Sequence, residues 1–214
     1  MTAIMIVDDH DLVRTGLKNI LADAEDFELV GEASSGEEAI HLARDLEPDV
    51  ILMDVGLPGL SGLETTERIL KVQPDIRVIV LTAHSEPPLP ARLLDIGATG
   101  YLTKACNAQE LINAVRTVRR GERYIGADIA QQLALSLLPG TPQSPFQELT
   151  GRELEIALML IQGMKMPSIG EVIKVSPKTV ATYKYRIYEK IGVNSEVELL
   201  RMALRYGLVS ADSA

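Results

Sequence analysis

The sequence lacks several features of secreted and membrane proteins. It contains one cysteine, Cys106, so no disulfide can form within the chain, and a reducing compartment is expected. No apolar stretch approaches the roughly 20 residues that a transmembrane helix needs. Strand-like sequence begins at Ile4, so we expect no signal peptide. These absences predict a cytoplasmic protein without a membrane segment.

Aromatic residues and positive charge are also scarce. There is no tryptophan and only 4% of the residues are aromatic, yet a hydrophobic content of 46% allows a substantial core. The net charge of −9 argues at first against nucleic-acid binding. However, residues 1–120 hold 20 acids and 11 bases, whereas residues 148–214 hold 8 acids and 9 bases. The acidity therefore belongs to the first part, and the last part could meet a phosphate backbone.

The pattern along the chain predicts two domains. The first 120 residues alternate apolar runs with helical periods, which is typical of βαβ units around a parallel sheet. Prolines after Ser85 predict a late, short fourth helix, and residues 121–135 are expected to form a further helix. Residues 139–145 have the composition of a linker, and the pattern beyond them is helical. The predicted parts are a first domain at 1–122, a linker helix and Pro-rich linker at 123–146, and a second domain at 147–214.

Four apolar runs in the first part end in polar residues. Each run is typical of a parallel strand that is buried on both faces. The carboxyl ends of such strands form the binding edge of an open α/β sheet, so these polar residues are expected to meet in one crevice. Residues 4–7 are followed by Asp8 and Asp9, 50–53 by Asp54, 78–81 by Thr82, and 100–103 by Lys104.

These residue types together suit phosphoryl transfer. An aspartate such as Asp54 can accept a phosphoryl group and form an acyl phosphate, which requires charge neutralisation around the phosphoryl oxygens. Mg²⁺ prefers carboxylate, water and phosphate oxygens, and Asp8 and Asp9 could supply the carboxylates. Lys104 could pair with the phosphoryl group, and the Thr82 hydroxyl could donate to it. The alternative, that the acids are helix caps or solvated loop charges, explains any one of them but not the set.

The first part resembles the receiver domain of bacterial response regulators, a (βα)5 flavodoxin-like α/β fold. The matching stretches are Ile-Val-Asp-Asp-His at 6–10, Met-Asp-Val-Gly-Leu-Pro-Gly at 53–59, Leu-Thr-Ala at 81–83 and Gly-Tyr-Leu-Thr-Lys at 100–104. The resemblance implies that a sensor histidine kinase phosphorylates Asp54. It also implies that Asp9 and the Gly56 carbonyl bind Mg²⁺ directly, together with Asp54, and that Asp8 holds a metal-bound water. Thr82 and Tyr101 would form the switch pair.

An aspartyl-phosphate phosphatase is the main enzymatic alternative. Such enzymes need a second acid two residues after the nucleophile to protonate the leaving group, and that position is Gly56 here. We therefore expect no enzyme acting on external phosphoesters. The receiver is expected only to catalyse its own phosphoryl transfer and slow dephosphorylation.

The second part has clear helix signals. Thr150 and Glu153 fit a capping box, Pro167 suits the first turn of a short helix, and Ser176 with Pro177 fits the start of a third. The last helix is expected from Glu196. The side chains expected to face the core are Leu154, Ala157, Leu158 and Ile161, then Ile169, Val172 and Ile173, then Val180, Tyr183, Ile187 and Ile191, then Leu199, Leu200, Ala203 and Leu204.

The third of these helices could enter a major groove. A helix-turn-helix reads DNA with its second helix, and residues 176–190 carry four bases against one acid. On charge alone, an ordinary solvated amphipathic helix is an equal alternative. Residues 149–200 resemble the LuxR-type helix-turn-helix domain of the NarL/FixJ class through Leu-Thr-Gly-Arg-Glu at 149–153, Val-Ser-Pro-Lys-Thr-Val at 175–180 and Lys-Ile-Gly-Val at 190–193. Within that class, the string Ser-Pro-Lys-Thr-Val-Ala-Thr-Tyr-Lys-Tyr-Arg-Ile-Tyr-Glu-Lys at 176–190 and the string Ile-Ala-Gln-Gln-Leu-Ala-Leu at 129–135 are most similar to the GacA/UvrY/SirA branch.

This second resemblance implies a smaller all-α domain that binds double-stranded promoter DNA. It implies base contacts by Ala181, Thr182 and Tyr185, and phosphate contacts by Lys178, Thr179, Lys184 and Arg186. Val197, Leu200, Arg201 and Leu204 on the last helix would form a homodimer surface, and a two-fold dimer implies a palindromic site. The implied targets are small regulatory RNA genes. The alternative is a receiver protein that acts mainly through protein–protein contacts.

Overall fold

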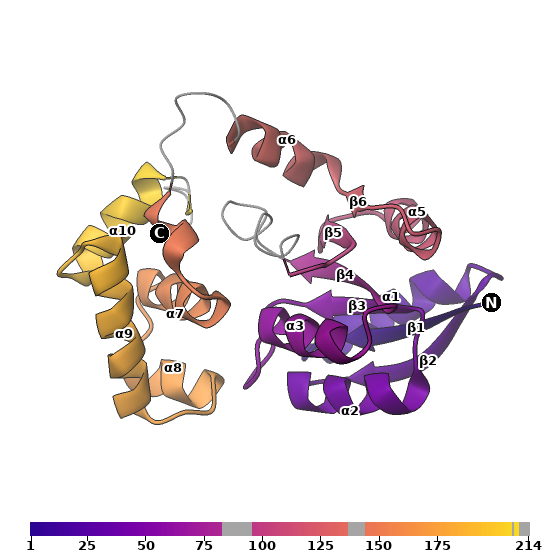
Figure 1. The fold of residues 1–214 in the computed structure, drawn as a ribbon, viewed down its shortest axis with the longest axis horizontal. Coiled ribbons are helices and arrows are strands. Elements are labelled where there is room, and N and C mark those ends of the chain that lie inside the picture. The colour runs from indigo at the N-terminus through magenta and orange to yellow at the C-terminus, as the bar shows by residue number, and fades with distance from the viewer. Residues whose placement is uncertain (83–95, 137–143, 207, 210–214) are drawn as a thin grey trace. The chain divides into compact units, whose positions relative to one another are not determined.

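The computed structural model describes residues 1–82, 96–136, 144–206 and 208–209 (Figure 1). By their contacts these residues divide into two compact units, with the division between Gln131 and Gln132. The fourth helix predicted after Ser85 lies outside the described residues, as do residues 139–143 of the predicted linker.

The first unit is built on a six-stranded parallel sheet in the order β2-β1-β3-β4-β5-β6. The strands are β1 (Thr2–Val7), β2 (Phe27–Ala33), β3 (Val50–Asp54), β4 (Arg77–Thr82), β5 (Gly100–Thr103) and β6 (Tyr124–Ile125). The helices are α1 (Asp11–Ala22), α2 (Gly36–Leu46), α3 (Gly62–Val72) and α5 (Ala108–Arg119), and α6 (Ala127–Ser136) begins in this unit and continues past the division. The predicted α/β class with a parallel sheet is confirmed.

Helices cover both faces of this sheet, which explains why the central strands are apolar throughout (Figure 1). Every residue of β3 is buried. Alternate strand residues such as Ile4 and Leu52 pack with α1 and α5, and Leu111, Ala114 and Val115 of α5 are fully buried. Helices α2 and α3 contact each other on the opposite face.

The helix predicted over residues 121–135 is wrong in its first part. Gly121 has a φ of +83° just after α5, and Tyr124–Ile125 forms the short strand β6 instead. The N–H groups of Tyr124 and Gly126 donate to the carbonyls of Thr99 and Tyr101, at 3.0 and 2.9 Å. These bonds pair the edge of β5 that would otherwise be open. Because the pairing joins residues that are far apart in the sequence, hydrophobic periodicity does not reveal it. The helix therefore begins only at Ala127.

The described part of the second unit is helical, as predicted. It contains the 3-10 turn η1 (Pro145–Glu148) and the helices α7 (Gly151–Ile161), α8 (Met166–Val172), α9 (Pro177–Ile191) and α10 (Glu196–Arg205). The capping box is confirmed, since Glu153 accepts from the Thr150 N–H at 2.7 Å and the Thr150 hydroxyl accepts from the Glu153 N–H. Ser176 caps α9 with Pro177 at its first position.

Several predictions of inward-facing residues in this unit need correction. On α7 the buried apolar residues are Leu154, Ile156, Ala157 and Leu160, whereas Leu158 and Ile161 are half-buried. Helix α7 is apolar on nearly every side, so periodicity alone could not fix its buried face. Val172 is 42% exposed because Ile173, the C-cap, takes the core position after this seven-residue helix. Tyr183 and Leu200 are half-buried and Leu204 is exposed, so the buried seams of α9 and α10 are narrower than predicted.

Candidate functional site

Parallel strands bring the predicted reactive residues to one edge of the sheet. Asp8 follows β1, Asp54 ends β3, Thr82 ends β4 and Lys104 follows β5. Asp8, Asp54 and Thr82 are 1%, 4% and 2% exposed. The Lys104 ammonium lies 2.7 Å from Asp8 Oδ2 and 2.9 Å from Asp54 Oδ2, and the backbone N–H of Lys104 donates to the Thr82 carbonyl at 2.7 Å. Four strand ends thus form a single site.

Burial and neighbouring charges shift the pKa values of both Asp54 and Lys104. Burial raises the pKa of Asp54, and the nearby Asp8 adds to this effect, although the charge and hydrogen bond of Lys104 oppose it. Burial would by itself lower the pKa of Lys104, but its hydrogen bonds and ion pairs with Asp8 and Asp54 raise it overall. The lysine therefore remains a cation between the two acids.

Carboxylate oxygens converge at this edge in a way that fits a hard divalent cation. Ligand atoms of Asp8, Asp9, His10 and Asp54 all lie within 4.8 Å of one another. Gly56 is adjacent, since its N–H hydrogen-bonds Asp54. Three carboxylates are the donor type that Mg²⁺ prefers, so the residues present fit such an ion. The His10 ring, which the sequence does not mark as a ligand, lies at the rim with Nδ1 2.8 Å from Asp9 Oδ1 and 3.1 Å from Asp8 Oδ1.

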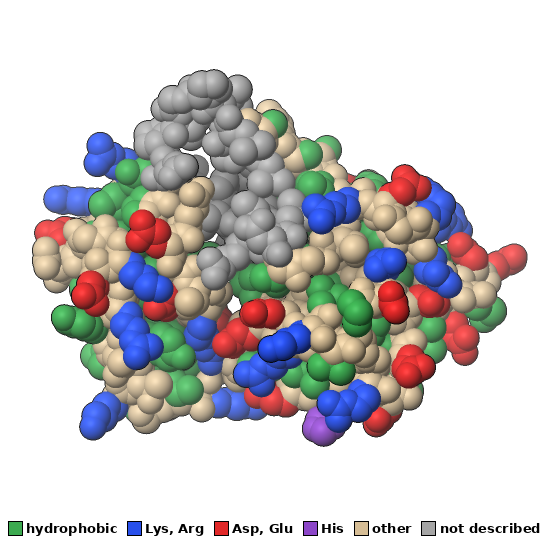
Figure 2. All heavy atoms as spheres, in the orientation of Figure 1, with side chains coloured by type: hydrophobic (Ala, Val, Ile, Leu, Met, Phe, Trp, Pro, Cys, Tyr) green, Lys and Arg blue, Asp and Glu red, His purple; other side chains and the backbone are tan. Residues whose placement is uncertain are grey.

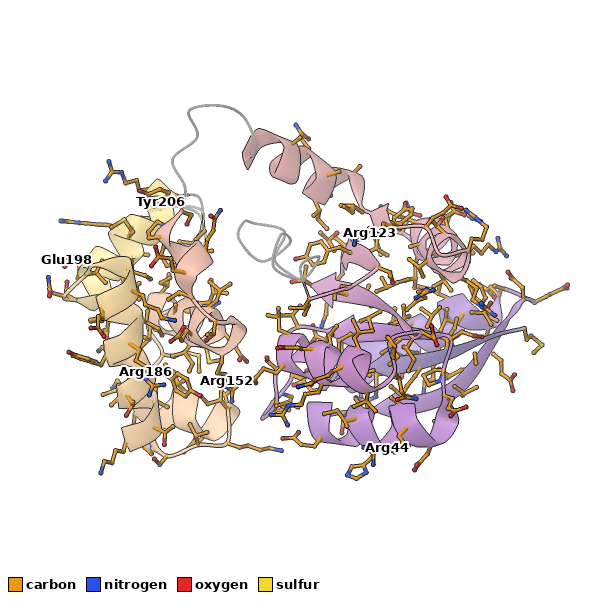
Figure 3. All side chains as sticks on the ribbon, viewed as in Figure 1. Arg44, Arg123, Arg152, Arg186, Glu198 and Tyr206 are labelled. Carbon is orange, nitrogen blue, oxygen red and sulfur yellow. The ribbon has the colours of Figure 1, made fainter. Side chains whose placement is uncertain are left out.

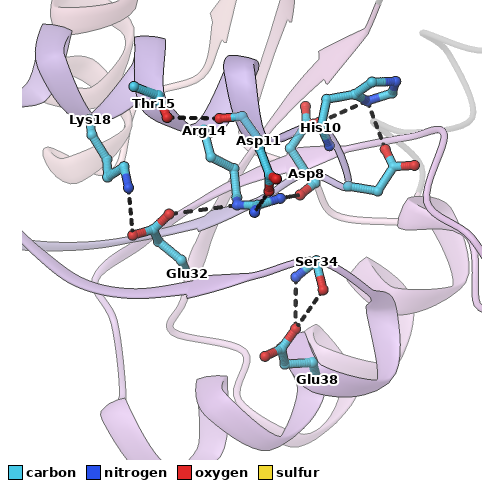
Figure 4. A network of polar contacts seen from close by, with 10 residues as sticks. Asp8, His10, Asp11, Arg14, Thr15, Lys18, Glu32, Ser34 and Glu38 are labelled. Carbon is cyan, nitrogen blue, oxygen red and sulfur yellow. Dashed lines mark hydrogen bonds and ion pairs between the residues drawn. The ribbon is translucent and has the colours of Figure 1, made fainter.

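Asp8 is anchored at each of its polar groups. Its N–H donates to the Ala33 carbonyl at 3.1 Å, and its carbonyl accepts from Arg14 Nη1 at 2.6 Å (Figure 4). Its Oδ1 accepts from the His10 N–H at 2.8 Å, and its Oδ2 accepts from Lys104 at 2.7 Å. Sequence reasoning missed Arg14, because nothing in the helical period of α1 distinguishes it from an ordinary surface arginine.

The predicted switch residues Thr82 and Tyr101 lie on neighbouring strands. Tyr101 is completely buried on β5, which pairs with β4. Burial raises the pKa of the Tyr101 phenol, and a hydrogen bond with the Thr82 side chain opposes this effect. The two side chains are thus in contact at the edge that carries Asp54.

In the second unit, one face of α9 carries most of the predicted DNA contacts. Lys178, Ala181, Thr182, Tyr185 and Arg186 are exposed, and Tyr185 reaches 70%. Arg186 is labelled on α9 in Figure 3. A hollow of about 300 Å³ on this face is lined by Lys178, Thr179, Thr182, Tyr183 and Arg186. On the visible face of this unit, Lys and Arg side chains lie among apolar and acidic ones (Figure 2).

Lys184 differs from the other predicted phosphate contacts. Its ammonium lies 2.6 Å from Glu196 Oε1 and 5.4 Å from the centre of the Tyr188 ring, and its side chain is 25% exposed. This lysine therefore links α9 to the start of α10. Thr179 also has a local role, because its hydroxyl lies 2.8 Å from the Ser176 hydroxyl at the helix cap.

Buried charges hold the helices of this unit together. Arg152 of α7 donates to the Ile173 carbonyl at 2.9 Å and pairs with Glu155 at 2.7 Å (Figure 3). Lys190 of α9 pairs with the buried Glu153 of α7 at 2.6 Å. Helix α7 thereby ties down both the end of α8 and the end of α9, which fixes the exposed face of α9 on a rigid frame.

The last helix presents a partly apolar outer face. Val197 is 60% exposed and Leu204 is 38% exposed, while Arg201 is also exposed and Leu200 is half-buried.

None of the described helices is long and apolar enough to cross a membrane.

Comparisons with known proteins agree for both units. The family described as "Response regulator receiver domain" matches residues 4–116, and that described as "Bacterial regulatory proteins, luxR family" matches residues 147–203. "Response regulator GacA" of Pseudomonas aeruginosa is 50% identical over 214 residues, which is 100% of both chains. "Response regulator UvrY" of Escherichia coli strain K12 is 46% identical over 214 residues, covering 100% of this chain and 98% of the relative.

Solved structures resemble the chain as well. A LuxR-family two-component response regulator from Aurantimonas sp. SI85-9A1 has 34% identity and a TM-score of 0.62, covering 64% of this chain and 97% of its own. RcsB from Salmonella enterica serovar Typhimurium, bound to promoter P1flhDC with the phosphomimetic BeF3-, has 24% identity and a TM-score of 0.70. That match covers 94% of this chain and 97% of the RcsB chain and speaks for the fold alone.

Proposed function

The chain belongs to the response regulators of two-component systems, with a receiver domain followed by a luxR-family regulatory domain, and we propose that phosphorylation of Asp54 controls promoter binding by α9. The observation that carries this proposal is the convergence of Asp8, Asp54 and Lys104 at one buried sheet edge. A DNA-binding transcriptional regulator is what its GacA-type and UvrY-type relatives and its second domain support.

In the proposed reaction, a carboxylate oxygen of Asp54 attacks the phosphoryl group on a sensor histidine kinase. The bond from phosphorus to the kinase histidine breaks, and an acyl phosphate forms on Asp54. Lys104 stabilises the charge of the phosphoryl oxygens from its place beside Asp54. Asp8, Asp9, Asp54 and the Gly56 carbonyl would hold Mg²⁺, which supplies further charge neutralisation when bound.

We propose no turnover on external substrates. Gly56 stands where a phosphatase would place its proton donor, so the acyl phosphate is lost only by slow hydrolysis. The signal leaves the site through Thr82 and Tyr101, whose contact at the sheet edge can respond to charge at Asp54.

In the second domain, Ala181, Thr182 and Tyr185 would read base edges, and Lys178, Thr179 and Arg186 would contact phosphates. Lys184 would contact phosphate only after exchanging its pairing with Glu196. The exposed apolar side chains of α10 support a homodimer on a palindromic site. We further propose a cytoplasmic location and small regulatory RNA genes as targets, on the strength of the resemblance to GacA and UvrY.

Promoter binding with and without acetyl phosphate and Mg²⁺ tests this function. The wild-type protein should bind more tightly after phosphorylation, whereas Asp54→Ala should not respond. If both proteins bind equally and ignore the phosphodonor, DNA binding stands but Asp54 does not control it. If neither binds promoter DNA in any state, the alternative of a receiver that acts through protein–protein contacts replaces the proposal.

A further inference from the structure

We propose that Arg14 is a positioning residue that holds the turn carrying Asp8 and Asp9 in the geometry that a divalent cation requires. This inference rests on the proposed function, because it takes the acidic cluster as the Mg²⁺ site of the phosphorylation reaction. Arg14 contacts none of the predicted ligand atoms itself and acts through the backbone of Asp8.

Arg14 contacts the turn itself at Asp8, the first turn of its own helix at Asp11, and strand β2 at Glu32. From α1 its guanidinium donates to the Asp8 carbonyl at 2.6 Å and pairs with Asp11, and its Nε lies 3.6 Å from Glu32 Oε2 on β2 (Figure 4). Its side chain is only 16% exposed. A guanidinium presents five donors in a fixed planar fork, so it can serve several acceptors at once, which a lysine ammonium on its flexible stem does less well.

The N-terminus of α1 lacks the side-chain cap that α2, α3 and α5 have. Helices α2, α3 and α5 each begin with a side-chain cap, from Ser35, Ser61 and Asn107 respectively. Helix α1 begins after His10, whose side chain makes no capping hydrogen bond. The turn between β1 and α1 carries two predicted metal ligands, so the contact from Arg14 to the Asp8 carbonyl supplies a constraint that a capping residue supplies elsewhere.

A positioning role and a purely electrostatic role predict opposite effects on metal binding. Arg14 is a cation near a cation site, so removing its charge should by Coulomb's law tighten the binding of a metal ion. Mg²⁺ demands near-octahedral geometry at about 2.0–2.1 Å, and loss of residues that orient metal ligands typically costs about 10–100-fold in affinity. If Arg14 acts by position, removing it should therefore weaken metal binding despite the lost repulsion.

Lys18 offers a matched control on the same helix. It lies one turn after Arg14, and its ammonium is 3.1 Å from Glu32 Oε1, so it shares the Glu32 partner. Within the part of the chain that the structure describes, its partner is Glu32, and it makes no hydrogen bond to Asp8. Lys18→Gln removes the same unit of charge and keeps the contact from Arg14 to the Asp8 carbonyl.

The experiment is a Mn²⁺ titration of the full-length protein, followed by the electron paramagnetic resonance signal of the free ion. Mn²⁺ suits the same oxygen ligands in octahedral geometry as Mg²⁺. Arg14→Gln should raise the Kd at least about 10-fold. Arg14→Lys should recover only part of the affinity, because it restores the charge but not the fork. Lys18→Gln should bind as the wild type does, or slightly more tightly. Circular dichroism during heating separates loss of metal affinity from loss of folding.

Two results would overturn the inference. One is an Arg14→Gln protein that is folded and binds Mn²⁺ as tightly as the wild type or more tightly. The other is a Lys18→Gln protein that weakens binding as much as Arg14→Gln does. If Arg14→Gln fails to fold, Arg14→Lys decides, and full wild-type affinity in that variant rejects the role of the fork. Failure of the wild type to bind Mn²⁺ would instead reject the metal site of the proposed function, and this inference with it.

Discussion

In the first unit the candidate reactive groups lie at buried strand ends, whereas in the second unit the predicted DNA contacts lie on an exposed helix face. Asp8 and Asp54 are 1% and 4% exposed, while Tyr185 of α9 is 70% exposed. The polar groups of Asp8 are all engaged inside the protein. The exposed face of α9 leaves several side chains available to a partner. In the first unit an enclosed site, in which Asp8 and Asp54 are buried and paired with Lys104, suits a covalent reaction, whereas the open face of α9 suits contact with a polymer.

The difference predicts two patterns of response to mutation. In an enclosed site the groups act as a unit, so loss of one group should abolish the reaction or distort its neighbours. On an open face the contacts are separate, so each loss should cost a limited amount and the losses should add.

The largest expected effect is at the enclosed site. Asp54→Ala removes the nucleophile and should abolish phosphorylation completely, because the other carboxylate that pairs with Lys104, Asp8, is also held by the His10 N–H and is assigned to the metal site. Incubation with radiolabelled acetyl phosphate and Mg²⁺ measures the label on the protein. Label retained by Asp54→Ala would remove Asp54 as the acceptor and would contradict the assignment of the buried sheet edge as the reactive site.

A graded loss is expected on the open face from Tyr185→Ala. Loss of a side chain that reads a base should cost about 1–3 kcal/mol on the cognate promoter and relax the preference at that position. Titration of promoter DNA and of a scrambled duplex measures both quantities. An equal loss on the two duplexes would assign Tyr185 to the backbone rather than to base reading, and no loss on either would remove it from the interface.

A smaller and less selective loss is expected from Lys178→Ala. A phosphate contact contributes equally on all sequences, so affinity should fall on cognate and scrambled DNA alike. The slope of log K against log salt should decrease by about one unit. Lys184→Ala serves as a comparison. Because Lys184 is already paired with Glu196, its loss should change the slope less than the loss of Lys178 does. An unchanged slope in Lys178→Ala would exclude it as a phosphate contact.

The smallest expected effect is on stability at the enclosed site in the absence of metal. Because the folded-state pKa of Asp54 is raised, its charged form is disfavoured by folding. The contribution of Asp54 to the stability of the metal-free wild type should therefore fall as pH rises from the unfolded pKa of about 3.9 through the raised folded pKa. Asp54→Asn stays neutral and should unfold at a higher temperature than the wild type at pH 7 in EDTA. The gap should close at low pH, and a gap that is independent of pH would contradict this account.

Sequence reasoning succeeded where the signal is local or repeats along the chain. Asp54 and Lys104 could be assigned to one edge because each follows an apolar strand, and parallel strands share that edge. The capping box of Thr150 and Glu153 and the cap at Ser176 are patterns of three or four residues. Such features need no knowledge of distant partners.

The parts that escaped prediction depend on contacts across the fold. Tyr124–Ile125 forms a strand because β5 leaves an open edge, and the pairing of Lys184 with Glu196 depends on the packing of α9 against α10. Arg14 has a neighbour in space, the Asp8 carbonyl, that no helical period encodes. Val172 and Ile173 were both predicted to face the core, but only Ile173, which follows the end of α8, is buried.

The short strand β6 has a practical consequence for dividing the protein. The N–H groups of Tyr124 and Gly126 donate to the carbonyls of Thr99, just before β5, and of Tyr101 on β5, so β6 covers the edge of β5. A chain truncated after residue 122 would expose that strand as an unpaired edge, which invites pairing between copies and aggregation. A first unit that keeps residues through Gln131, where the compact unit ends, retains the protecting strand and should remain monodisperse where the shorter piece precipitates.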